Sequence, residues 1–70
     1  MRDYVWDIKK GDTIHEFEYG DHFVGIALED ARKQGDGFAC TVKDKKSERI
    51  VEFFANPEFS AYAPDITIER

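Results

Sequence analysis

The chain has 70 residues, which leaves room for one domain, placed over residues 1–70. Its net charge of −5 argues against general binding to nucleic-acid phosphates. The only cysteine, Cys40, excludes an intramolecular disulfide, and no apolar run approaches the roughly 20 residues that span a bilayer. We therefore expect a cytoplasmic protein without a membrane segment.

The segments Tyr4–Ile8 and Thr13–Tyr19 alternate between apolar and polar side chains, which is typical of half-buried strands. Strands are predicted from Tyr4 to Ile8, from Thr13 to Tyr19 and over residues 22–28, with Gly20-Asp21 as a two-residue hairpin turn. The alternative is an α+β fold, in which a helix at 21–34 begins at Asp21 and packs on an antiparallel sheet. Against this helix, Gly25 would lie in its interior.

The hairpin turn sets an expected register. Pairing Tyr19 with His22 places four apolar residues on one face, which we expect to be the core side. These residues are Phe17, Val24, Ile26 and Leu28.

The second half of the chain predicts another hairpin after a turn at Gly35-Asp36-Gly37. Strands from Phe38 to Lys43 and from Glu48 to Phe54 flank a polar turn, and pairing Cys40 with Val51 gives one continuous apolar face. Pro57 favours a short helical turn near 57–62, and Ile66 with Ile68 indicates a short closing strand.

These elements predict an all-β or β-rich α+β fold, as a small five- to six-stranded antiparallel barrel. Over residues 11–69 the layout resembles that of SH3-like barrels, because a single helical turn separates the last two strands. The aromatic-rich first loop and paired tryptophans of the peptide-binding SH3-like version are absent, so the resemblance implies no proline-rich ligand.

Few residue patterns in this sequence favour catalysis or cofactor binding, and we expect neither. In the predicted register His15 and His22 lie roughly 13 Å apart, too far for one metal ion. Cys40 lies on an apolar strand face, where it serves as a small hydrophobe. The paired acids, such as Glu29-Asp30, are expected on solvated surfaces.

Two groups remain as candidate binding residues. A predicted basic tip surrounds the second hairpin turn and consists of Lys43, Lys45, Lys46 and Arg49. The aromatic residues exceed what one face of a small barrel can hold, so some are expected at the surface, where they can anchor a protein partner. These candidates are Tyr4, Trp6, Tyr19, Phe59 and Tyr62.

The sequence thus predicts a small non-catalytic protein-interaction module or adaptor with an aromatic and acidic surface, present as a monomer or weak homodimer. Its expected partner is another protein. One alternative is an acidic inhibitor that mimics nucleic-acid charge, which fits the net charge of −5. A second alternative is a small nucleic-acid-binding β-barrel that uses the basic tip.

Overall fold

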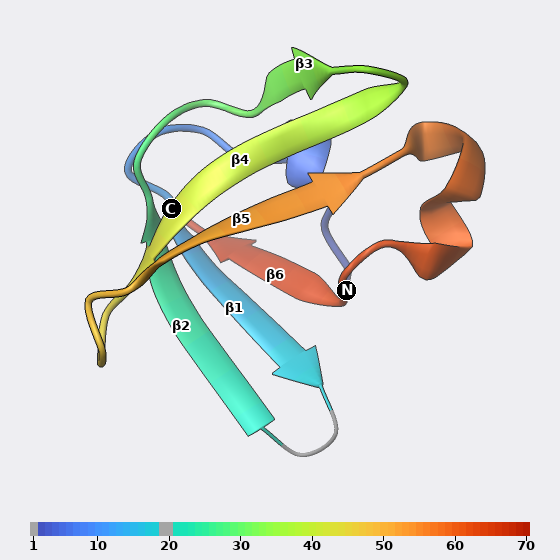
Figure 1. Ribbon diagram of the computed structural model, residues 1–70. Helices are drawn as coiled ribbons and strands as arrows, with labels where there is room; N and C mark the ends of the chain where they lie inside the picture. Colours follow the sequence, from blue (N-terminus) through green and yellow to red (C-terminus); the bar gives the residue numbers. More distant parts are fainter. Residues whose placement is uncertain (1, 19–20) are drawn as a thin grey trace.

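Six antiparallel strands form one sheet in the computed structural model, which describes residues 2–18 and 21–70 (Figure 1). This confirms the predicted all-β fold, and strand β2 excludes the alternative helix at 21–34. The elements are η1 (Val5–Asp7), β1 (Thr13–Glu18), β2 (Asp21–Ala27), β3 (Arg32–Gln34), β4 (Gly37–Asp44), β5 (Ile50–Ala55), η2 (Pro57–Tyr62) and β6 (Ile66–Glu69), where η denotes a 3₁₀ turn.

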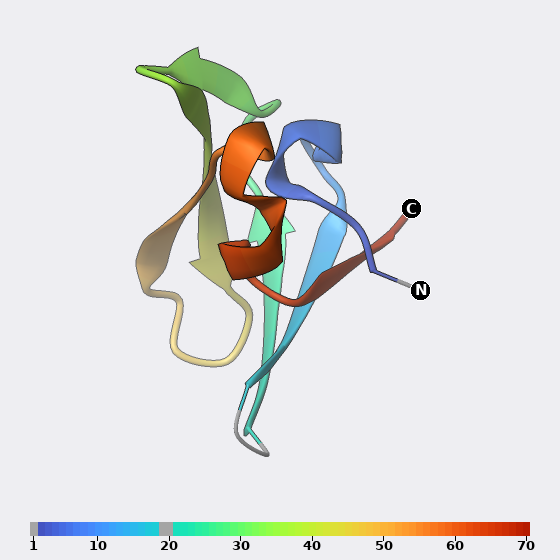
Figure 2. The ribbon, with the colours of Figure 1, turned by 90° about the vertical axis from the view of Figure 1, so that its right-hand side faces the viewer.

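The strand order is β3-β4-β2-β1-β6, and β5 pairs with β4. The long strand β4 contacts β3 through its first half and β2 through its second half, so the sheet curves into a half-barrel (Figure 1). Figure 2 shows both 3₁₀ turns on one side of this curved sheet. The predicted helical turn at 57–62 and the predicted closing strand are confirmed.

The β1–β2 hairpin forms, but its register differs from the prediction. His22 pairs with Phe17 rather than with Tyr19, and the last described pair is Glu18 with Asp21. Tyr19 and Gly20 lie outside the described residues. Each residue of β1 therefore pairs with a residue of β2 that lies two positions nearer the turn than predicted.

The core face of this hairpin is also the opposite of the predicted one. Ile14 and Ala27 are buried, whereas Phe17 is 50% and Leu28 is 40% exposed. The physical reason lies at Gly25, where a Cβ atom would be 2.5 Å from Cγ1 of Val42. Only glycine lets β2 approach β4 this closely, so the face that carries Gly25 must point inward.

In the β4–β5 hairpin the predicted face is right and the register is wrong by two residues. Cys40 pairs with Phe53 instead of Val51, and both residues are buried. The loop is longer than predicted because the Asp44 amide donates to the carbonyl of Arg49. A two-residue shift preserves the facing of every side chain, which is why the apolar face survives.

Two segments were predicted incorrectly. The stretch from Tyr4 to Ile8 is a 3₁₀ turn at Val5–Asp7 rather than a strand, because the apolar residues Val5 and Ile8, three positions apart, are both buried. Strand β3 was not predicted. It forms because Gly35, with φ of 56°, turns the chain so that Gln34 pairs with Gly37.

One acid, Asp12, is buried inside this fold. Its carboxylate accepts hydrogen bonds from the Lys9 amide at 2.8 Å and from Nε of Arg70 at 3.2 Å. A buried carboxylate is tolerated only when it is paired in this way. The bond also joins the loop before β1 to the last residue of the chain.

Candidate functional site

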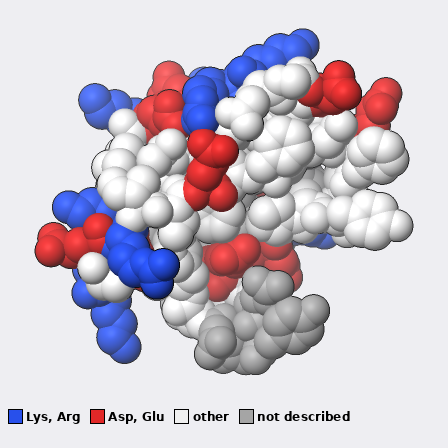
Figure 3. All heavy atoms as spheres, viewed as in Figure 1, with Lys and Arg blue, Asp and Glu red and all other residues white. Residues whose placement is uncertain are grey.

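Exposed aromatic side chains gather on β5 and η2. Phe54 is 47%, Phe59 is 58% and Tyr62 is 86% exposed, and together they line a shallow hollow of about 270 Å³. We call these three residues the β5–η2 patch. In Figure 3, white surface predominates on the right-hand side of the molecule, where Figure 1 shows η2, with acidic side chains at its upper edge. Lys and Arg gather elsewhere on this face.

The local sequence explains why the side chains of η2 face solvent. Pro57 begins the turn, and the Asn56 side chain caps it by accepting a hydrogen bond from the Glu58 amide at 2.9 Å. At the other end, the Arg2 guanidinium donates to the carbonyl of Ala63. None of the six residues of η2, all of which are described, is buried. The turn is thus held at its ends, and its aromatic rings are left outside the core.

Tyr4 and Trp6 differ from the patch, although they were predicted as binding residues as well. Their rings stack with centroids 4.6 Å apart and planes within 3°. Trp6 also packs on Phe38 at 6.3 Å and against the buried core. Both side chains are only half-buried, but their packing gives them a structural role.

The structure therefore divides the predicted aromatic set. Phe59 and Tyr62 are brought together, while Tyr4 and Trp6 form a separate cluster with Phe38. Tyr19 lies outside the described residues. Phe54 was missing from the predicted set, although alternation with the inward-facing neighbour Phe53 pointed to an outward ring.

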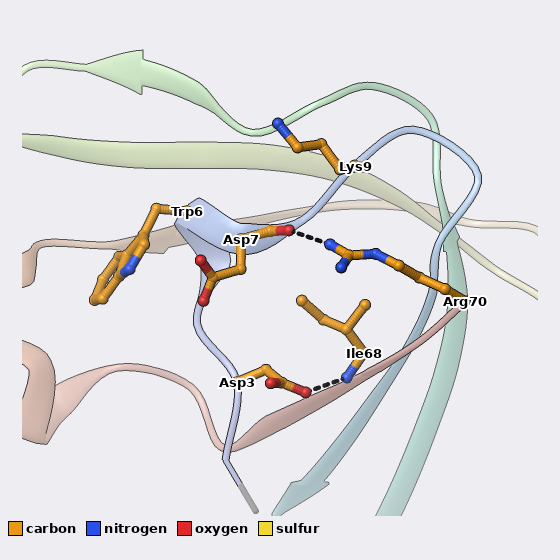
Figure 4. A pocket seen from close by; sticks show the side chains of 6 residues that line it. All are labelled: Asp3, Trp6, Asp7, Lys9, Ile68 and Arg70. Atoms are coloured by element: carbon orange, nitrogen blue, oxygen red, sulfur yellow. Dashed lines mark hydrogen bonds between the residues drawn. The ribbon is translucent and has the colours of Figure 1, made fainter.

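A second hollow, of about 380 Å³, lies beside Trp6 (Figure 4). Two of the side chains that line it, Asp3 and Arg70, are engaged within the chain. Arg70 donates to the Asp7 carbonyl at 2.7 Å, and Asp3 accepts from the Ile68 amide at 2.7 Å. These bonds fasten the N-terminal segment to β6.

The predicted basic tip lies on the β4–β5 loop, where Lys45, Lys46 and Arg49 are exposed. Acids interrupt it, because Lys43 approaches Glu48 at 3.6 Å and Asp44 ends β4 at the start of the same loop. The Lys46 amide donates to the Asp44 carboxylate and lowers its pKa. The tip is therefore a mixed-charge loop held by its own hydrogen bonds.

The surroundings of Cys40 and Glu29 indicate a structural role for both residues. Burial raises the pKa of Cys40 to about 11, so its thiol stays protonated at neutral pH. Hydrogen bonds from the side chain and the backbone amide of Thr41, the latter at 2.9 Å, lower the pKa of the Glu29 carboxylate. Arg32 then bridges Glu29 at 2.5 Å and Glu52 at 2.6 Å. These groups join β4, β5 and the segment before β3.

The predicted separation of His15 and His22 is wrong. His15 Nδ1 and His22 Nε2 lie 3.0 Å apart, not roughly 13 Å. The observed register pairs His22 with Phe17, two residues from His15 on the same face, and this brings the rings together. Within residues 2–18 and 21–70, no three His, Cys, Asp or Glu side chains surround a common point suited to a metal ion.

Neither 3₁₀ turn nor any other helix among the described residues has the length and hydrophobicity to cross a membrane. Comparisons with protein-family models, curated proteins and solved structures find no match to this chain. Its function must be argued from its own surface.

Proposed function

We propose that the chain is a non-catalytic protein-interaction module that binds another protein through the β5–η2 patch. The observation that carries the proposal is the exposure of Phe54, Phe59 and Tyr62 around one hollow. Contiguous exposed apolar surface on a small soluble domain marks an interaction site more often than chance. Aromatic side chains also dominate the binding energy of protein interfaces.

The outer face of β5 carries one more exposed apolar side chain, separated from Phe54 by the exposed Glu52. Ile50 is 59% exposed and lies on the same side of the strand as Phe54. Strand β5 pairs with β4 and with no other strand of the described chain, so its second edge is open to an added strand. An extended partner segment on this edge would place side chains beside the patch.

The charge around the patch indicates the chemistry of the partner. Glu58 in η2 and Asp65 just after it are exposed, and neither forms an ion pair with a described residue. The whole chain carries a net charge of −5. A segment that combines apolar residues with Lys or Arg would complement this surface.

The order of the strands supports an SH3-like layout as part of the proposal. Strands β6, β1, β2, β4 and β5 follow one another across the sheet, and η2 connects β5 to β6. In this layout the patch would lie on the last hairpin strand and the following turn.

The test compares three forms of the chain as affinity baits in native lysate. The Phe59→Ala/Tyr62→Ala variant removes two patch rings, and Leu28→Ala is the matched control because Leu28 is also exposed but follows β2. We expect a partner bound by wild type and the control to bind the patch variant at least tenfold more weakly, about 1.4 kcal/mol.

Binding of that partner is then quantified with purified proteins, and hydrogen exchange should show protection in β5 and η2. Equal melting temperatures of the three baits establish that the patch variant is folded. Partners that bind all three baits equally well would contradict the proposal.

A further inference from the structure

The outer face of the β1–β2 hairpin carries a histidine pair that is independent of the β5–η2 patch. His15 pairs with Val24 across the hairpin, and His22 pairs with Phe17. The two histidines are therefore diagonal neighbours on one face of the sheet. Their ring centroids are 5.2 Å apart and their planes are inclined by 22°.

Glu69 determines which nitrogen of His15 is available. Its Oε1 lies 3.0 Å from His15 Nε2. Because a carboxylate accepts hydrogen bonds, Nε2 carries the proton, and neutral His15 then presents a lone pair on Nδ1. This lone pair faces His22 Nε2 at 3.0 Å.

His22 is held from its other side. The Phe17 ring stacks on it with centroids 4.4 Å apart and planes within 11°. Both rings are thus positioned before any ligand arrives, His15 by Glu69 and His22 by Phe17. Such positioning limits the ordering entropy that a ligand must overcome.

We propose that His15 Nδ1 and His22 Nε2 form a two-imidazole site for a divalent transition-metal ion of the Zn²⁺, Ni²⁺ or Cu²⁺ class. Imidazole nitrogens bind such ions at about 2.0–2.1 Å, so two ligands at a tetrahedral angle lie about 3.3 Å apart. At a square-planar angle they lie about 2.9 Å apart. The observed 3.0 Å falls between these two values.

Binding requires little rearrangement of the chain. The proton of neutral His22 moves to Nδ1 through solvent, which frees the Nε2 lone pair, and no net proton is lost. Glu69 then takes the place of the carboxylate that orients a metal-bound histidine from behind. Water fills the remaining coordination positions, and nitrogen donors favour this class of ion over Mg²⁺ or Ca²⁺.

The test titrates the intact chain with ZnCl₂ and, separately, NiCl₂ by calorimetry in a non-coordinating buffer. We expect one ion per chain. His15→Ala and His22→Ala should each weaken binding at least about tenfold, and Glu69→Gln by about 10- to 100-fold. Glu58→Gln, on η2, and Cys40→Ala, at the buried thiol, should bind like wild type.

The wild-type chain provides a readout that does not depend on the variants. Zinc should shift the ¹⁵N resonances of His15 Nδ1 and His22 Nε2, while His15 Nε2 remains protonated. Zinc should also raise the melting temperature of wild type and not that of His22→Ala. Undisturbed ring resonances, or equal affinity in wild type and His22→Ala, would overturn the proposal and leave a hydrogen-bonded pair.

Discussion

Two aromatic groups in this small chain have opposite surroundings. Tyr4 stacks on Trp6, and Trp6 and Phe38 pack on each other and on the core, whereas Phe54, Phe59 and Tyr62 face solvent. The difference comes from the short turns that carry them. In η1, Val5 is buried, as is Ile8 just after the turn, and together they draw the whole segment onto the sheet, whereas η2 buries none of its residues. Whether an aromatic ring in these turns is packed or exposed therefore depends on whether neighbouring residues of the chain are buried.

The largest effect should come from Trp6→Ala. Removing this half-buried ring takes away its contacts with Tyr4 and Phe38 and leaves a gap beside the core, so we expect a loss of about 2–3 kcal/mol in the free energy of unfolding. Tyr62→Ala should change it by less than about 0.5 kcal/mol. Urea denaturation of both variants measures the contrast, and equal losses would erase the distinction between the groups.

An intermediate effect is expected for Gly37→Ala, which tests how Phe54 is held. A Cβ atom at this position would lie 2.5 Å from the Ala55 carbonyl oxygen and 2.7 Å from Cζ of Phe54. The ring can move, but the backbone oxygen of the paired strand cannot move easily, so unfolding should become easier by about 1–2 kcal/mol. Thermal or urea denaturation gives the value. A neutral result would show that β4 and β5 can separate without loss.

The smallest effect should come from Glu29→Gln, at the polar bridge that ends beside the outer face of β5. The pKa of Glu29 is lowered from 4.5 by its hydrogen bonds with Thr41, so the carboxylate form stabilises the folded state. This stabilisation is fully present above about pH 4.5 and is lost as the pH falls through the lowered folded pKa.

Wild type should therefore melt slightly above Glu29→Gln at pH 7, and the two should converge in acid. Melting curves from pH 7 down to pH 3 measure this, with Glu58→Gln as an exposed control. A difference in melting temperature between wild type and Glu29→Gln that widens in acid would contradict the stabilising role of the Glu29 carboxylate.

Alternation of apolar residues was sufficient to predict most strands, but it did not determine which face of a hairpin is buried. In β1–β2 the deciding contact is Val42 against Gly25, made between residues far apart in sequence. Both registers depended on turn details, such as the bond from the Asp44 amide to Arg49. The segment at Tyr4–Ile8 was ambiguous, because Val5 and Ile8 fit a helical spacing while the alternation fits a strand.

The prediction of the candidate sites was limited in the same way. Phe59 and Tyr62 could be predicted because they lie in the short helical turn that begins at Pro57, where few neighbours can cover them. The packing of Tyr4 and Trp6 depends on η1, which was not predicted. The histidine pair was missed because a register error of two residues separates rings that in fact touch.

The bond between Asp12 and Arg70 has a consequence for how the chain acquires its structure during synthesis. The cationic partner of Asp12 lies 58 positions later in the sequence, and the second strand that pairs with β1 is β6. A ribosome-bound chain that lacks residues 66–70 would hold Asp12 without its cationic partner and leave one side of β1 unpaired. We therefore expect the native state of this domain to form only after residues 66–70 have left the exit tunnel.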